Sequence, residues 1–138
     1  MTEEMMDGQL EIIETFDMFD DWMEKYQYII DLGRQLEPMD ESLKIDENLL
    51  QGCQSRVWLV HEFKNGKLHF QANSDAAIVS GLIALVMTIY SNQTPKKIIE
   101  TEPDFIELIG LASHLSSTRS NGLNAMIDKI KNTAESYQ

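Results

Sequence analysis

The chain has 138 residues, 43% of them hydrophobic, and its 23 acidic residues outnumber its 11 basic ones to give a formal net charge of −12. One domain of this length buries roughly two-thirds of the surface that its unfolded chain exposes. The acidity argues against binding nucleic acid or an acidic membrane surface, because both depend on Lys and Arg to neutralise phosphates. The longest apolar run, Leu82–Met87, is far too short to span a bilayer.

Cysteine usage and the N-terminus indicate the cell compartment. The single cysteine, Cys53, excludes an intramolecular disulfide, and residues 2–7 have neither the basic nor the apolar region of a signal peptide. These features predict one domain, residues 1–138, in the reducing cytoplasm. We expect residues 1–17 to be flexible or specific to a partner.

Two amphipathic helices are predicted at the start of the chain. Leu10, Ile13 and Phe16 recur at helical spacing, and Asp20 and Asp21 form a good N-cap pair for the next helix. One face of that second helix consists of Trp22, Tyr26, Ile29, Ile30 and Gly33. An aromatic stripe at this spacing is typical of a core-facing helix.

A loop and a β-hairpin follow. Residues 39–48 are polar and are expected to form a loop with a short strand near Ile45. Two β-rich runs, 57–63 and 68–72, flank Asn65-Gly66, the strongest short signal for a hairpin turn. A two-residue turn pairs Phe63 with Leu68. The predicted core face of the hairpin comprises Val57, Leu59, His61, Phe63, Leu68, Phe70 and Ala72.

The central helix is predicted at residues 76–90, which are apolar almost all round, with Ser74 or Asp75 as its cap. Gly81 lies in the middle of this helix, where glycine costs about 0.5–1 kcal/mol relative to alanine. Close approach of another backbone is therefore the expected reason for Gly81.

Shorter helices complete the predicted fold. Thr94-Pro95 is typical of a helix start, and a short helix is expected to end near Gly110. The hydroxyl cluster 116–120 is expected to cap a last amphipathic helix. Together these elements predict an α+β fold, in which five or six helices pack on one face of a small antiparallel sheet of about three strands.

Cys53 is the strongest candidate for chemistry, because its thiol lies in a predicted loop within the stretch Leu50–Trp58. Gly52 allows backbone dihedrals that would present the cysteine at a loop tip, and Arg56 within reach would favour the thiolate. From chemistry alone, three roles stay open: a nucleophile, a carrier of a transferred group, or a buried core filler.

Other catalytic or metal-binding signals are weak. His61 lies eight residues beyond Cys53 along an extended strand, out of direct reach at about 3.3 Å per residue unless the chain bends back. A histidine satisfied within the core is therefore the preferred interpretation. One cysteine and three scattered histidines provide no convincing zinc ligand set.

Several blocks of the sequence occur in a characteristic order and spacing. They are Trp22–Gly33, Gln51-Gly52-Cys53-Gln54-Ser55-Arg56-Val57-Trp58, Asn73–Ala84 and Leu115–Leu123. Together they resemble the SufE family, the sulfur-acceptor proteins that work with cysteine desulfurases in iron–sulfur cluster assembly. The resemblance extends from about Phe19 to Ala134.

The resemblance implies that Cys53 accepts sulfur from the persulfide of a cysteine desulfurase and carries it as a persulfide. It also implies that Asp75 and Arg119 belong to the docking surface for the desulfurase. The cysteine loop and its hinge would comprise Gln51, Gly52, Gln54, Ser55, Arg56 and Trp58.

The same resemblance implies the partners and the fold. The partner would be a SufS-like desulfurase, the recipient a SufBCD-like cluster scaffold, and the layout would be shared in outline with NifU-like scaffold proteins. No cofactor of its own is expected, because the desulfurase holds the pyridoxal phosphate. The chain would be a sulfur-transfer accessory protein and not a stand-alone enzyme.

Two other functions stay open. Cys53 could be the nucleophile of a cysteine hydrolase or peroxidase, with a base supplied in space by His61, His69 or His114. Alternatively, the chain is an acidic protein-interaction module in which the cysteine is incidental.

Overall fold

The structure is a computed structural model that describes residues 3–51 and 55–138, with side chains from residue 8 onward except that of residue 112. In chain order the helices and strands are α1 (Glu3–Asp17), α2 (Trp22–Arg34), the 3-10 turns η1 (Glu41–Leu43) and η2 (Asp46–Asn48), β1 (Val57–Lys64), β2 (Lys67–Ser74), α3 (Ala77–Tyr90), α4 (Pro95–Glu100), α5 (Phe105–Leu108), α6 (Leu111–His114) and α7 (Ser117–Glu135).

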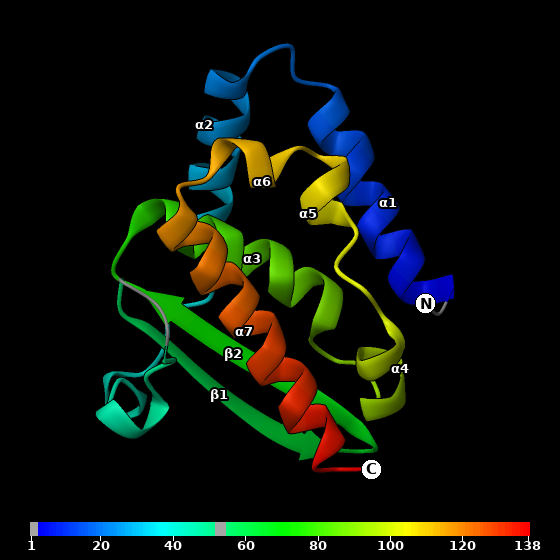
Figure 1. The fold of residues 1–138 in the computed structure, drawn as a ribbon. Helices are drawn as coiled ribbons and strands as arrows, with labels where there is room; N and C mark the ends of the chain where they lie inside the picture. The colour runs from blue at the N-terminus through cyan, green and yellow to red at the C-terminus, as the bar shows by residue number, and fades with distance from the viewer. Residues whose placement is uncertain (1–2, 52–54) are drawn as a thin grey trace.

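A β-hairpin forms one layer of the fold, and helices form the other. In Figure 1, α3 and α7 lie across the hairpin, while α1, α2, α5 and α6 gather at the opposite end of the molecule. The predicted α+β class with a small antiparallel sheet is confirmed. The helix count is higher than predicted, with seven α-helices in the described residues, because Gly110, at φ +80°, separates two single-turn helices.

The third strand expected near Ile45 does not form, and the sheet of the described residues has two strands. Local side-chain bonds compete with strand pairing in this segment. The carboxylate of Asp40 accepts a hydrogen bond from the amide of Ser42 at 3.0 Å and so starts η1. All that remains of a third strand is an isolated bridge between Leu49 and Trp58.

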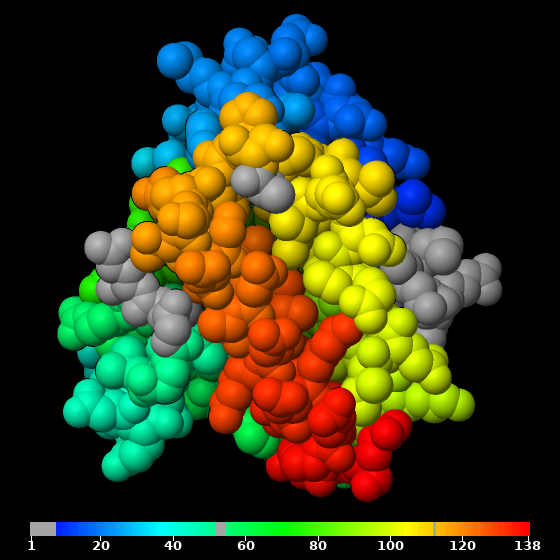
Figure 2. Space-filling view, in the orientation of Figure 1, coloured from blue at the N-terminus to red at the C-terminus, as the bar shows by residue number. Residues whose placement is uncertain are grey.

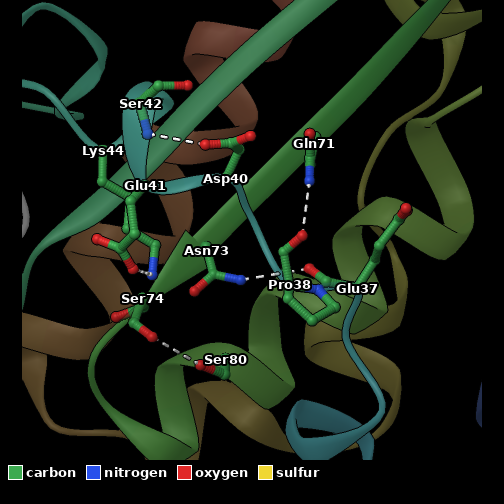
Figure 3. A network of polar contacts seen from close by, with 10 residues as sticks. All are labelled: Glu37, Pro38, Asp40, Glu41, Ser42, Lys44, Gln71, Asn73, Ser74 and Ser80. Carbon is green, nitrogen blue, oxygen red and sulfur yellow. Dashed lines mark hydrogen bonds and ion pairs between the residues drawn. The ribbon is translucent and has the colours of Figure 1, made fainter.

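The segment between α2 and β1 crosses the outer side of the sheet. Figure 3 shows the side-chain amide of Gln71 donating to the carbonyl oxygen of Pro38, and that of Asn73 donating to the carbonyl oxygen of Glu37, both at 3.3 Å. Met39, next in the chain, is buried. This segment is therefore held against β2 before it turns toward the cysteine loop.

The hairpin has the predicted register. Phe63 pairs with Leu68, and Asn65 and Gly66 form the turn with φ angles of 55° and 78°. The predicted core face is only partly correct, because His61 and Phe63 are exposed at the far end of β1. The remaining members of that face are buried or half-buried: Val57, Leu59, Leu68, Phe70 and Ala72.

Helix caps follow the predictions in two cases and differ in a third. Asp21 caps α2, and Thr94 caps α4 ahead of Pro95. The N-cap of α3 is Ala76, which has no side-chain cap, so the expected capping by Ser74 or Asp75 is wrong. The hydroxyl of Ser74 accepts from the amide of Ala76 instead, and the carboxylate of Asp75 pairs elsewhere.

Helices α2 and α3 approach each other closely enough for their backbones to touch. A Cβ added at Gly81 would lie 2.0 Å from the carbonyl oxygen of Ile29, and one added at Gly33 would lie 2.7 Å from the amide nitrogen of Gly81. Real Cβ atoms do not tolerate such distances, so both positions require glycine. The predicted reason for Gly81 is confirmed.

The N-terminal helix is tied into the core. The described part of residues 1–17, which were expected to be flexible or partner-specific, forms α1. The side chain of Phe16 is 1% exposed, and that of Gln9 is 2% exposed. The side-chain nitrogen of Gln9 donates to the backbone carbonyl oxygen of Glu102 at 3.0 Å, and the side-chain oxygen of Gln9 accepts from the backbone amide of Phe105 at 2.9 Å. These bonds hold α1 against the loop that leads into α5.

We expect Gly81→Ala to lower the free energy of unfolding by about 3 kcal/mol, the upper end of the usual cost of overpacking. The added methyl group would overlap the carbonyl of Ile29. Urea denaturation measures the change. Gly8→Ala is the matched control, because nothing lies within 4 Å of a Cβ built there in α1. The control should stabilise the protein by up to about 1 kcal/mol, and equal stability of the two variants would contradict the close helix contact.

Candidate functional site

Three residues of the predicted cysteine loop, Gly52, Cys53 and Gln54, lie outside the described residues. The amide of Leu50 donates to the carbonyl oxygen of Val57 at 2.8 Å, so the two chain segments at the base of the loop are joined. Gln51 is exposed on one side of the loop, and Ser55 is half-buried on the other.

Arg56 and Asp75, one predicted in the hinge and one in the docking surface, form an ion pair. Arg56 Nε lies 3.1 Å from Asp75 Oδ2, and the two side chains are 65% and 47% exposed. An exposed ion pair contributes little stability, about 0.2–1 kcal/mol. The ion pair instead fixes the position of two segments, because it joins the start of β1 to the turn before α3.

Trp58 lies between two cations on the outer side of the sheet. Its side chain is 7% exposed, and Lys44 Nζ and Arg56 Cζ lie 5.7 Å and 5.3 Å from ring centroids of its indole. Cation–π contacts at these distances hold the indole against both neighbours. Lys44 was missed in the sequence, because it comes from a segment predicted only as a polar loop.

A cavity of about 320 Å³ opens beside the described end of the cysteine loop. Its buried or half-buried apolar wall consists of Val57, Val79, Leu82, Leu123 and Met126. Its polar residues, mostly exposed, are Ser55, Ser116, Thr118 and Arg119. The cavity therefore has an apolar interior and a polar opening that contains one guanidinium group.

Arg119 reaches this opening from the first turn of α7. Ser116 is the N-cap of that helix, and its hydroxyl accepts a hydrogen bond from the amide of Arg119 at 3.2 Å. The predicted capping by the hydroxyl cluster is confirmed. Among the described residues, no carboxylate forms an ion pair with the guanidinium of Arg119, which is exposed.

The three histidines lie in other parts of the described structure and do not line this cavity. His61 Nε2 is 3.0 Å from the hydroxyl of Tyr137. His69 contacts the side-chain oxygen of Asn92 through Nδ1. The ring of His114 stacks on Trp22, with centroids 3.8 Å apart.

Residues 3–51 and 55–138 contain neither a metal site nor a membrane-spanning helix. Groups of three or more His, Cys, Asp or Glu side chains arranged to hold a metal ion are absent from this part of the chain. No helix in it has the length and apolar character needed to cross a membrane.

Comparisons with known proteins give one consistent result. The family model described as "SufE: Fe-S metabolism associated domain" matches residues 10–134. An uncharacterised SufE-like protein of Rhizobium meliloti (strain 1021) is 42% identical over 130 residues, which cover 91% of this chain and 93% of that protein. The solution structure of a hypothetical protein from Thermus thermophilus shares the fold, with a TM-score of 0.76 at 16% identity over 94% of each chain.

We expect Ser116→Ala to lower the free energy of unfolding by about 1 kcal/mol, because it removes the oxygen that caps α7 at Arg119. Ser117→Ala is the control, since Ser117 is the exposed first residue of the same helix. Urea denaturation of both variants measures the difference. A loss at Ser117 as large as that at Ser116 would contradict the capping role.

Proposed function

The chain belongs to the SufE family, and from this premise we propose that it is a sulfur acceptor that takes persulfide sulfur from a cysteine desulfurase onto Cys53. Membership of the family gives the protein a role in iron–sulfur metabolism. The proposal concerns the residue that carries the sulfur, the partner that supplies it and the recipient.

The reaction is an exchange at sulfur. The thiolate of Cys53 attacks the outer sulfur of the desulfurase persulfide, a new S–S bond forms on Cys53, and the desulfurase cysteine leaves as a thiolate. The number of S–S bonds is unchanged, and no external oxidant or reductant is needed. The rate depends on the thiolate fraction and on access, so no neighbouring acid–base pair is required.

The observation that carries the proposal is the cavity beside the cysteine loop. Its apolar wall suits a group that must be kept from thiols in a reducing cytoplasm between encounters. Burial in such a wall raises the pKa of a thiol, and a nearby guanidinium lowers it. The guanidinium of Arg119 lies at the opening of the cavity and would lower the pKa of a thiol held there. We expect the Gln51–Arg56 loop to swing out when the desulfurase docks.

The docking surface would combine the cysteine loop with Asp75 and Arg119. Arg56 joins this surface through its ion pair with Asp75. The desulfurase would hold the pyridoxal phosphate and cleave the carbon–sulfur bond, and this protein would raise its turnover. Sulfur would then pass to a SufBCD-like cluster scaffold.

The alternative functions find less support in the described structure. A cysteine hydrolase or peroxidase needs a base near its nucleophile. None of the three histidines lines the cavity beside the cysteine loop, because each contacts a residue in another part of the described structure. An interaction module in which the cysteine is incidental predicts that Cys53→Ser keeps full activity.

We expect the intact chain to gain about one or more sulfur atoms when it is mixed with a cysteine desulfurase and cysteine. Mass spectrometry of the whole protein measures the gain, and a reductant should remove it. Cys53→Ser, with the same fold by circular dichroism, should gain none. Sulfur loading of the serine variant, or no loading of the native chain while the desulfurase carries persulfide, would contradict the proposal.

We expect charge reversal at the docking surface to reduce stimulation of the desulfurase. Asp75→Lys and Arg119→Glu should each raise, by about tenfold, the concentration of this protein that gives half-maximal stimulation of the desulfurase. Each variant replaces an attraction to a group of opposite charge on the desulfurase with a repulsion. Sulfide release measures the stimulation. Glu100→Lys and Lys96→Glu, exposed reversals on α4, are the matched controls. Unchanged stimulation by both docking variants would show that the interface lies elsewhere.

A further inference from the structure

Two ion pairs meet at the buried indole of Trp58. Lys44 Nζ lies 3.1 Å from Glu41 Oε1 and 5.7 Å from a ring centroid of the indole. Arg56 contacts the same indole and forms an ion pair with Asp75. Each cation on the ring is therefore held by a carboxylate. We call this set of side chains the Trp58 clamp, and its members are Glu41, Lys44, Arg56, Trp58 and Asp75.

The two halves of the Trp58 clamp come from opposite ends of the cysteine loop. Glu41 and Lys44 belong to η1 and its C-cap, before the loop, and Arg56 directly precedes β1, after the loop. Figures 1 and 2 show η1 and η2, in cyan to blue-green, at an outer corner of the molecule. Trp58 therefore joins the chain that enters the loop to the chain that leaves it.

The chain that enters the loop, residues 45–51, has few other supports in the described structure. The amide of Leu50 donates to the carbonyl oxygen of Val57, and Leu49 forms an isolated bridge with Trp58 itself. A hollow of about 440 Å³ lies between residues 47–51 and α7, so this segment is not packed tightly against that helix. Its position therefore depends on its contacts with β1 and on Lys44.

The two cations of the Trp58 clamp differ in exposure. The side chain of Lys44 is 24% exposed, whereas that of Arg56 is 65% exposed. Asp75, which holds Arg56, also belongs to the proposed docking surface. A desulfurase that binds Asp75 would compete for its carboxylate and release Arg56, while Lys44 stays in place. The half of the clamp after the loop is thus the one that opens on docking.

We propose that Lys44 is a positioning residue for sulfur transfer, which holds the entering end of the cysteine loop on Trp58 while the leaving end moves. The inference rests on the proposed function, because it concerns the loop that presents Cys53 to the desulfurase. A loop with one fixed end moves in fewer directions, so a larger share of encounters brings the two reacting sulfur atoms together. In this role Lys44 acts through Trp58.

The first test needs no partner and measures hydrogen exchange in the full chain by nuclear magnetic resonance. Lys44→Gln removes the cation, so exchange at the amide of Leu50 should become about five to ten times faster. Lys44→Arg should exchange like the native chain, because a guanidinium also stacks on aromatic rings. Lys64→Gln, which removes an exposed cation at the far end of β1, is the matched control and should change nothing. The amide of Leu68, bonded to the carbonyl oxygen of Gln93, reports on the rest of the fold and should stay native-like.

The second test measures stimulation of a cysteine desulfurase by sulfide release. Lys44→Gln should lower the maximal stimulation about fivefold, because the loop presents Cys53 less often in the productive geometry. The concentration of this protein that gives half-maximal stimulation should stay within about twofold of the native value, because Asp75 and Arg119 are intact. Lys44→Arg should restore the maximum, and Lys64→Gln should leave both quantities unchanged.

Exchange and stimulation together separate positioning from other roles of Lys44. Unchanged exchange at Leu50 in Lys44→Gln, an equal rise at Leu68, or no recovery in Lys44→Arg would overturn the proposal. A raised half-maximal concentration with an unchanged maximum would also overturn it, because Lys44 would then be a docking residue. A native chain that neither gains sulfur nor stimulates the desulfurase would contradict the proposed function and this role in transfer with it. Faster exchange at Leu50 would still show that Lys44 holds the loop.

Discussion

The contact between the backbones of α2 and α3 determines how the other elements are placed. Because Gly33 and Gly81 have no Cβ, α3 lies against the buried Ile29 and passes through the centre of the fold. Its first turns provide Val79 and Leu82 to the cavity beside the cysteine loop. Two glycines in distant parts of the chain thus define one wall of the candidate site.

Features set by short stretches of sequence could be predicted. Asn65-Gly66 specifies the hairpin and its register, and Gly81 in an apolar helix predicts a close neighbour. Features that depend on contacts between residues far apart in the sequence could not be predicted. Asp75 is a good helix cap by its position, but Arg56, 19 residues earlier, binds its carboxylate instead. The exposure of Phe63 depends on where α7 ends, which the hairpin sequence does not contain.

The candidate site shows the same division. Its cavity combines residues from the loop before β1, from α3 and from α7, and no spacing in the sequence indicates that Ser55, Leu82 and Met126 meet. Nothing in the sequence predicted a role for Lys44, because the contact of its ammonium group with the Trp58 ring is made across a turn. The roles assigned to Cys53 and Arg119 came from family resemblance and not from periodicity or charge.

The buried amide of Gln9 bears on the smallest fragment that can fold alone. A chain that began at α2 would leave the backbone amide of Phe105 without the partner that the side chain of Gln9 provides. A buried polar group without a partner costs about 1–3 kcal/mol, comparable with much of a small domain's stability. The folding unit therefore includes Gln9 and the part of α1 that holds it in place.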